Sequence, residues 1–387
     1  MEFRLSETQL MIRDTAREVA NNTIAKRADE IEKEKKVPQE VFEALAVAGL
    51  MGIPFPEEYG GIDAGYVSFA LACEEIARVS PSVCTSMVIS VFFMEAIRHY
   101  GNEEQKNMYL IPGIEGKIRG SLAFTEPDTG SDPKQIQTAY RKAGDSYVLN
   151  GVKRFITNAF FEGPILVFAK CQETKVITAF VFDKFIEGYS LSTPWETVGL
   201  RGSSICDVFL DEVKVPASAI VGEIGQGFDI LIGTVAHSKV AICAEFVGIM
   251  ATTYDLAVKY AKEKTHRGQS IAKFQAIQLK IARIAALVES ARLMTYILAE
   301  KSEDRSNMEH LNAWVGMVKA YVSDTAVECS TMAMNVLGAY GVTEEYRIER
   351  FVRDALFAPN VEGVSDIQRV IAASHILYAD DNLIENI

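Results

Sequence analysis

The sequence predicts an α+β fold in which an all-α N-terminal domain, a central β-domain and a C-terminal helical domain follow one another. Apolar residues recur with helical spacing up to about Ile118 and again after Gly227, whereas short β-branched and aromatic runs broken by turn residues lie between them. The chain has 387 residues, more than the roughly 250 to 300 at which single cores stop growing. We therefore expect domains at residues 1–120, 121–227 and 228–387.

The first domain carries start and stop signals of helices. Ser6 and Gln9 have the spacing of a capping box, in which each side chain accepts a hydrogen bond from the backbone of the other residue. Pro38 can open a helix that Gly49 helps to close, and Gly101 can end a long apolar stretch. We expect about five helices in this domain.

The central domain has the pattern of short strands. Asn150-Gly151 stands between the runs 147–149 and 155–156 and predicts a hairpin turn. The runs 165–169 and 176–182 predict further strands, and Val208-Phe209-Leu210 with Val213-Lys214-Val215 predict another pair of strands.

The third domain contains long segments rich in Ala, Leu and Ile between Phe228 and Ala339, and another between Ser365 and Tyr378. Their periodicity predicts helices. These helices can form a bundle inside the monomer, between subunits, or both.

Composition excludes several classes of function. The formal net charge of -13 argues against nucleic-acid binding, which depends on clustered Lys and Arg. No run reaches the ~18 apolar residues of a membrane span, and Met1-Glu2-Phe3-Arg4-Leu5 lacks the apolar core of a signal peptide. The six cysteines and five histidines show no metal-site spacing. We expect a cytoplasmic protein, or one in a matrix-type compartment after processing, without a metal.

Two short segments carry residues suited to chemistry. Residues 125–132 turn through Pro and Gly with hydroxyls on either side, so they can bind an anion or the polar edge of a ring, or simply connect two elements. Glu362 stands between apolar residues and Gly363, ahead of a helix that Ser365 can cap. Such a carboxylate is either a surface charge or a partly desolvated base. Residues 338–341 lack the third glycine of a dinucleotide fingerprint and follow no strand.

Taken together and in order, six motifs resemble the acyl-CoA dehydrogenase family, from Leu5 to Ile376. The motifs are Leu122-Ala123-Phe124-Thr125-Glu126-Pro127 through Asp132, Asn150-Gly151-Val152-Lys153 with Phe155-Ile156-Thr157-Asn158, Gly199-Leu200-Arg201-Gly202-Ser203, Phe274-Gln275, Val336-Leu337-Gly338-Ala339-Tyr340-Gly341, and Glu362-Gly363. The resemblance implies an α/β/α arrangement with a C-terminal four-helix bundle, usually as a homotetramer.

The resemblance also implies FAD between the β-domain and the bundle. Phe124, Thr125, Phe155 and Thr157 would meet the isoalloxazine edge, and Ser131 would lie near the cofactor and the pantetheine arm of the thioester. Glu362 would take the α-proton of an acyl-CoA while the β-hydrogen leaves as hydride to the flavin. The product would be a trans-2-enoyl thioester, and the electrons would pass to electron-transfer flavoprotein.

Departures from the family pattern concern the cofactor first. Lys264 stands where most members have an arginine for the FAD pyrophosphate, and Arg267 lies close by, so either cation can serve the phosphates. Asn335 replaces a glutamine before the motif that contains Gly338, and Val364 replaces a threonine. The resemblance therefore assigns these five residues to FAD binding, with some hydrogen bonds altered.

The thioester side departs as well. Lys239 replaces the usual arginine and Ala236 an aspartate, while Gly363 keeps its place beside the base. The resemblance assigns Ser131, Lys239 and Gly363 to substrate binding and leaves open whether CoA or a carrier protein bears the acyl group. Ser238 occupies the alternative base position of branched-chain members, so Glu362 has no rival there. An oxidase that passes electrons to oxygen and a non-catalytic flavoprotein are further alternatives.

Overall fold

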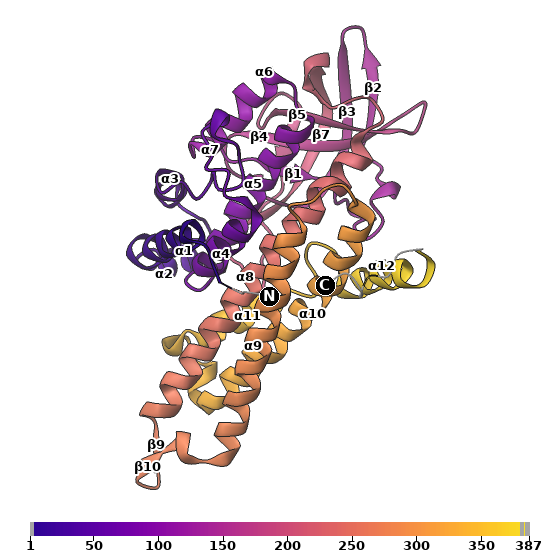
Figure 1. Ribbon diagram of the computed structural model, residues 1–387. Helices are drawn as coiled ribbons and strands as arrows, with labels where there is room; N and C mark the ends of the chain where they lie inside the picture. The colour runs from indigo at the N-terminus through magenta and orange to yellow at the C-terminus, as the bar shows by residue number, and fades with distance from the viewer. Residues whose placement is uncertain (1–3, 380–382, 384–387) are drawn as a thin grey trace.

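The structure, a computed structural model, describes residues 4–379 and Leu383. Three of the residues considered above for a signal peptide, Met1, Glu2 and Phe3, lie outside the described residues. A helical N-terminal part, a sheet and a long helical C-terminal part follow one another along the chain (Figure 1). The predicted fold class is confirmed.

The N-terminal helices begin and end at several of the predicted signals. Ser6 Oγ accepts from the Gln9 N–H, and the Gln9 side chain accepts from the Ser6 N–H, so the capping box is confirmed. Gly101 ends the fifth helix, and its N–H donates to Ile97 O at 2.8 Å. The expected five helices correspond to α1–α5, and two shorter ones follow. The bounds are α1 (Glu7–Val19), α2 (Ala28–Glu34), α3 (Gln39–Val47), α4 (Gly65–Ala77), α5 (Pro81–Tyr100), α6 (Glu103–Gln105) and α7 (Ile111–Ile114).

Within residues 4–379, eight strands form one mixed sheet. Its order is β6-β7-β3-β2-β4-β5-β8, and β1 pairs with β4. The pairs β1–β4 and β2–β4 are parallel and the others antiparallel. The bounds are β1 (Ser121–Ala123), β2 (Ala139–Ala143), β3 (Ser146–Thr157), β4 (Pro164–Cys171), β5 (Ile177–Asp183), β6 (Tyr189–Leu191), β7 (Ile205–Pro216) and β8 (Ile220–Val221).

Two predicted turns are instead irregularities inside continuous strands, so those predictions were wrong. Asn150-Gly151 lies in the middle of β3, and the two predicted runs 208–210 and 213–215 belong to the single strand β7. The strands pair with a register shift between Leu149 and Gly151. Asn150 Oδ1 accepts from the N–H of Glu212 at 2.9 Å, and Glu212 has a φ of 53°. The turn-forming residues therefore lie in bulges that face each other on β3 and β7, and such residues often mark bulges in sheets.

The C-terminal helices are long and form the lower half of the molecule in Figure 1. Helices α8, α9, α10 and α12 supply the bundle, in which α10 packs on the other three, and α11 packs on α8 and α10. A small hairpin of β9 and β10 lies at the end of the bundle remote from the sheet (Figure 1). The bounds are α8 (Gly227–Glu263), β9 (Thr265–His266), β10 (Gln269–Ser270), α9 (Gln275–Lys301), α10 (Met308–Leu337), α11 (Ile348–Ala355) and α12 (Ser365–Tyr378).

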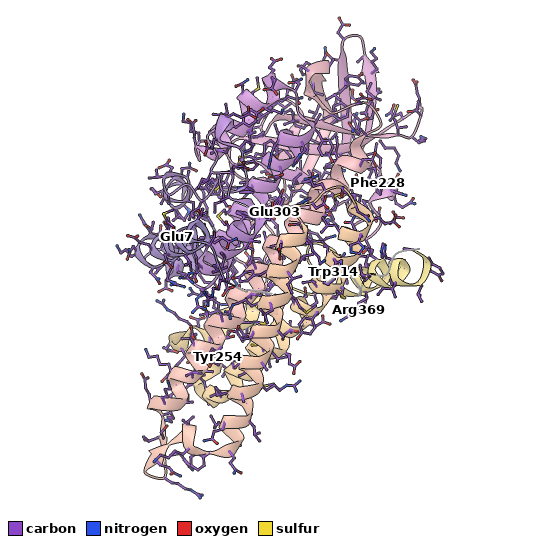
Figure 2. All side chains as sticks on the ribbon, viewed as in Figure 1. Glu7, Phe228, Tyr254, Glu303, Trp314 and Arg369 are labelled. Carbon is purple, nitrogen blue, oxygen red and sulfur yellow. The ribbon has the colours of Figure 1, made fainter. Side chains whose placement is uncertain are left out.

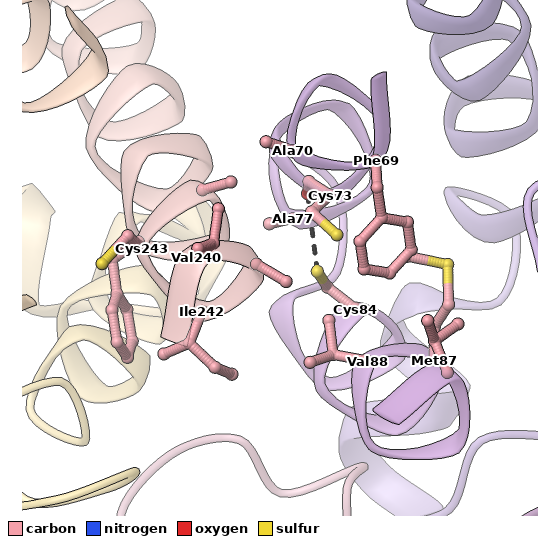
Figure 3. Close-up of a cluster of buried hydrophobic side chains, with 14 of the residues drawn as sticks. Phe69, Ala70, Cys73, Ala77, Cys84, Met87, Val88, Val240, Ile242 and Cys243 are labelled. Atoms are coloured by element: carbon pink, nitrogen blue, oxygen red, sulfur yellow. Dashed lines mark hydrogen bonds between the residues drawn. The ribbon is translucent and has the colours of Figure 1, made fainter. Parts of the chain in front are cut away.

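Helices α5 and α8 form the centre of the core. Both are long and apolar enough to cross a membrane, yet 94% and 89% of their most apolar windows are buried inside the protein. Figure 3 shows where α4, α5 and α8 meet, with Cys73, Cys84 and Val240 among apolar neighbours. The Cys84 thiol donates to Cys73 O at 3.5 Å, and all six cysteines are free thiols. These core helices fix the positions of the side chains considered next.

Candidate active site

Glu362 lies in the loop between α11 and α12 and is half-buried. Its φ is 51° and that of Gly363 is 89°, so two consecutive residues adopt the left-handed conformation. The φ of Gly363 explains the glycine, because residues with a β-carbon rarely adopt this conformation. The Oγ of Ser238 on α8 donates to Glu362 Oε2 at 2.9 Å. The carboxylate is therefore held by a helix distant in sequence.

Ser365 does not cap α12, contrary to the prediction. It is the first helical residue, Val364 is the N-cap, and the buried Ser365 Oγ has no hydrogen-bond partner among the described residues. The tight loop at Glu362 and Gly363 shifts the helix start by one residue. Val364, assigned above to FAD, is 38% exposed beside the base.

Two buried lysines lie near Glu362. Lys239 on α8 follows Ser238, and Lys319 comes from α10. Burial lowers the pKa of Lys239, and the charge of Glu362 opposes this shift. Burial also lowers the pKa of Lys319 to about 8, again opposed by Cys243 and then by Glu362. Among the described residues Lys239 Nζ has no hydrogen-bond partner, so it is available to a ligand, whereas Lys319 Nζ has two partners.

Helix α11, which precedes the loop that carries Glu362, packs against the segment 199–203. The Leu200 N–H donates to Asp354 Oδ1 at 2.6 Å. A β-carbon on Gly199 would lie 2.4 Å from the Arg353 carbonyl, so the segment 199–203 packs directly on the helix backbone. This sequence motif thus supports the helix that leads into the loop of Glu362.

The residues assigned to the isoalloxazine come together at the ends of β1 and β3. Phe124 and Thr125 follow β1, and the Arg154 N–H donates to Thr125 O at 2.8 Å, so this segment lies against β3. Phe155 sits in a β3 irregularity with a φ of 59° and is 49% exposed. The Thr157 side chain is half-buried at the end of β3. These four residues form one surface, which we call the β-platform.

The turn at 125–132 has a buried acidic residue at its base. Glu126 accepts from the Thr138 N–H at 2.9 Å and from Lys153 Nζ at 2.7 Å. Burial acts to raise the pKa of Glu126, but Lys153 and the neighbouring donors lower it below its ordinary value. The ion pair gives the turn a fixed shape, and Ser131 lies exposed on its outer side.

The β-platform is fixed to α5 through Asn158. This buried residue has a φ of 63°. Its Nδ2 donates to Ser86 O at 2.9 Å, and its Oδ1 accepts from Ser86 Oγ at 2.7 Å. Asparagine tolerates the left-handed conformation better than most residues, and its amide can satisfy both partners.

The residues of the β-platform fit a flavin ring. Phe155 packs on Trp195 with ring centroids 5.4 Å apart, which leaves an exposed apolar surface. The described residues provide no hydrogen-bond partner for the Thr125 and Thr157 hydroxyls, so both can serve a polar ring edge. The platform thus has the mixture of apolar surface and hydrogen-bonding groups that a flavin requires.

Four other residues assigned to FAD lie far from the β-platform. Lys264 and Arg267 lie at the β9–β10 hairpin, and Lys264 Nζ lies 4.8 Å from the Tyr340 ring centroid, close to Gly338 in sequence. Asn335 lines a groove of about 580 Å³ between α9 and α10. Figure 2 places Phe228, at the start of α8, near the sheet and Tyr254 towards the opposite end. The stretch of α8 from Lys239 to Glu263 alone rises about 36 Å. One chain therefore does not bring the two sets together.

The sequence predicted no contact between Ser238 and Glu362 and gave no role to Lys319. The hydrogen bond of Ser238 joins residues 124 positions apart, and no local pattern encodes it. Lys319 did leave a signal, because it is the single charge in the otherwise uncharged run from Leu311 to Ser323. A lysine on the buried face of a helix requires a partner.

Three family models match the chain in order. They describe the acyl-CoA dehydrogenase N-terminal domain at residues 6–117, the middle domain at 121–213 and the C-terminal domain at 225–377. Over 382 residues the chain is 34% identical to a probable acyl-CoA dehydrogenase, YngJ, of Bacillus subtilis strain 168, covering 97% of this chain and 100% of the relative. It is 35% identical over 383 residues to a 3-(aryl)acrylate reductase of Clostridium sporogenes, covering 96% and 99%.

Solved structures agree over nearly the whole length. Butyryl-CoA dehydrogenase of Megasphaera elsdenii has a TM-score of 0.93 at 30% identity, covering 97% of this chain and 100% of that one. A chain from work on the electron transferring flavoprotein of Acidaminococcus fermentans has a TM-score of 0.94 at 34% identity, covering 98% and 100%. The prolyl acyl carrier protein oxidase AnaB has a TM-score of 0.89 at 26% identity, covering 96% and 100%.

Proposed function

This chain belongs to the acyl-CoA dehydrogenase family, and from that premise we propose that it converts an acyl-CoA thioester to the trans-2-enoyl-CoA with FAD as its cofactor. The family fixes the broad class, an oxidoreductase acting on CH–CH bonds. The proposal adds the assignment of Glu362 as the base and of the β-platform as the flavin surface.

The observation that carries the proposal is the position of Glu362. Its carboxylate is half-buried, accepts from Ser238 Oγ at 2.9 Å, and lies in a loop whose left-handed conformation is fixed by its neighbours. Such a carboxylate can take the α-proton of a bound thioester. The described residues provide no acceptor for the Glu362 N–H, so this group can donate to the thioester carbonyl and stabilise the developing negative charge. FAD, when bound, supplies the acceptor for the β-hydride.

The second candidate is dehydrogenation or oxidation of an acyl or aminoacyl group on a carrier protein. The similarity to the prolyl acyl carrier protein oxidase AnaB favours it. Lys239 in place of the expected arginine also favours it, because a lysine loses the bidentate contact that an arginine makes with phosphate. An acyl-CoA remains the leading substrate because the curated relatives above 30% identity include short-chain acyl-CoA dehydrogenases.

We propose that the protein is a homotetramer, because the two sets of residues assigned to FAD lie far apart in one chain. A flavin nucleotide on the β-platform can reach cations equivalent to Lys264 and Arg267 only if they come from a second copy of the chain. The groove that includes Asn335 also contains exposed Leu279, and α12 exposes Leu377 and Tyr378. Apolar surface of this kind suits contact between subunits. We further propose electron-transfer flavoprotein as electron acceptor and a cytoplasmic location.

Anaerobic titration of the FAD-loaded enzyme tests the function. Butyryl-CoA, a long-chain acyl-CoA, a branched acyl-CoA, a cyclic acyl-CoA and a carrier-protein-bound prolyl group are added in turn while flavin absorbance is followed. Bleaching by one CoA thioester is expected. Bleaching by the carrier-bound group alone would favour dehydrogenation or oxidation on a carrier protein. The absence of bleaching by any of these compounds would refute both proposed functions. Steady peroxide production in air would show that oxygen, and not electron-transfer flavoprotein, accepts the electrons.

A further inference from the structure

Lys319 is a cation in the apolar centre of the bundle. It is 0% exposed, and its neighbours along α10 include Val315, Val318 and Val322, all equally buried. An ammonium group in such surroundings is strongly destabilising unless it is hydrogen-bonded. The interactions that Lys319 makes are therefore important for keeping the charge in this position.

Both partners of Lys319 belong to the loop that carries Glu362. Lys319 Nζ donates to Ala358 O at 2.9 Å and to Gly363 O at 2.6 Å. These carbonyls lie on either side of Glu362 in the sequence, so one side chain holds both ends of the loop. We call this pair of hydrogen bonds the clamp. Hydrogen bonds that involve an ionised group are stronger than those between neutral groups. They help to offset the strain of the left-handed conformation of Glu362.

Titratable groups of α8 and α10 also surround Lys319, and the charge of Glu362 is among those that act on it. On α8, burial raises the pKa of Cys243 to about 12 and that of Glu245 to about 8. On α10, Asp324 has the weakest effect among those named for Lys319. The remaining cation is Lys239 on α8. Two ammonium groups thus face one carboxylate.

We propose that Lys319 is the positioning residue of the base. Through Ala358 O and Gly363 O it holds the loop so that the Glu362 carboxylate and N–H face the same thioester. The catalytic part of this inference rests on the proposed function, whereas the clamp does not.

The test compares three variants of the FAD-loaded enzyme. Lys319→Met removes both donors and the charge, Lys319→Gln keeps a donor without the charge, and Lys184→Met is the matched control. Lys184 is also a buried lysine that donates to backbone carbonyls, Arg119 O and Asn158 O, both at 2.9 Å. Amide hydrogen exchange of residues 358–364 and the rate of flavin reduction as a function of butyryl-CoA concentration are measured.

The clamp predicts at least about tenfold faster exchange of 358–364 in Lys319→Met, less in Lys319→Gln, and no change in Lys184→Met. Unchanged exchange in Lys319→Met would overturn the clamp, even if no thioester reduces the wild type and the proposed function fails. Positioning of Glu362 predicts that flavin reduction at saturating butyryl-CoA slows at least about tenfold in Lys319→Met, and less in Lys319→Gln, while KM stays within about threefold of the wild type. A saturating rate in Lys319→Met equal to that of the wild type would overturn this second part.

Discussion

Ser238 Oγ donates to Glu362 Oε2 at 2.9 Å, and this bond joins the centre of α8 to the loop between α11 and α12. In branched-chain relatives the position of Ser238 is the one expected above to hold an alternative base. In this chain it supports the carboxylate instead. The bond also shows that the candidate base depends on packing between elements and not on its own loop alone.

Loss of the Ser238 hydroxyl should slow catalysis without affecting cofactor binding. A hydrogen bond to a charged group contributes about 1.5 kcal/mol or more, so Ser238→Ala should lower the single-turnover rate of flavin reduction about tenfold. Ser290→Ala is the control, because Ser290 Oγ lies 2.7 Å from Tyr321 Oη on the other helices of the bundle. Equal rates in Ser238→Ala and the control would refute a role of the bond in catalysis.

Asn158 should be necessary for stability. Its replacement by alanine leaves Ser86 without two hydrogen bonds in a buried site, and alanine is less tolerant of a positive φ. We expect the free energy of unfolding to fall by about 2 to 4 kcal/mol, as measured by denaturant unfolding of the apoprotein. Asn21→Ala, which removes an exposed contact with Arg17 O, should change it by less than about 0.5 kcal/mol. A similarly small effect at Asn158 would contradict its assigned role.

Glu245 should make stability depend on pH. It is fully buried on α8 and accepts from Thr85 Oγ1 at 2.9 Å. Burial raises its pKa to about 8, whereas an unfolded chain has a glutamate pKa near about 4.3. Folding therefore takes up a proton between these values, and stability is lost as pH rises through this window.

Replacing Glu245 by glutamine removes this titration while keeping an acceptor for Thr85. Glu245→Gln should be more stable than the wild type at pH 8, by on the order of 3 kcal/mol, and the advantage should vanish below about pH 4. Unfolding free energies across this range check the sign. A difference that does not vary with pH would show that Glu245 is ionised in the folded protein.

Signals within a few residues predicted local structure well. The capping box at Ser6 and the helix end at Gly101 depend on contacts with the adjacent turn, which any sequence window contains. The prediction of a hairpin turn at Asn150-Gly151 was wrong because the same dipeptide suits both a turn and a bulge. Its partner in the bulge, Glu212, is 62 positions away in the sequence. The actual turn between β2 and β3 lies at Gly144, which has a φ of 63°.

The candidate site depended more on tertiary packing. The motif at Glu362-Gly363 identified the acidic residue, but its hydrogen bonds come from Ser238 and its loop is held by Lys319. No periodicity relates these three residues. The positions of Lys264 and Arg267 were predicted as cofactor contacts from a motif, yet only the fold reveals that they lie at the far end of the bundle from the β-platform.

We propose that Glu362 takes the α-proton, and this role can be tested by rapid mixing of FAD-loaded Glu362→Gln with the thioester that bleaches the wild type. Glutamine keeps the size of the side chain and an oxygen that can accept from Ser238, so FAD binding should be unchanged. If Glu362 is the base, flavin reduction should slow by at least about a thousandfold. Reduction at a rate within a few-fold of the wild type would contradict it and would place the base elsewhere.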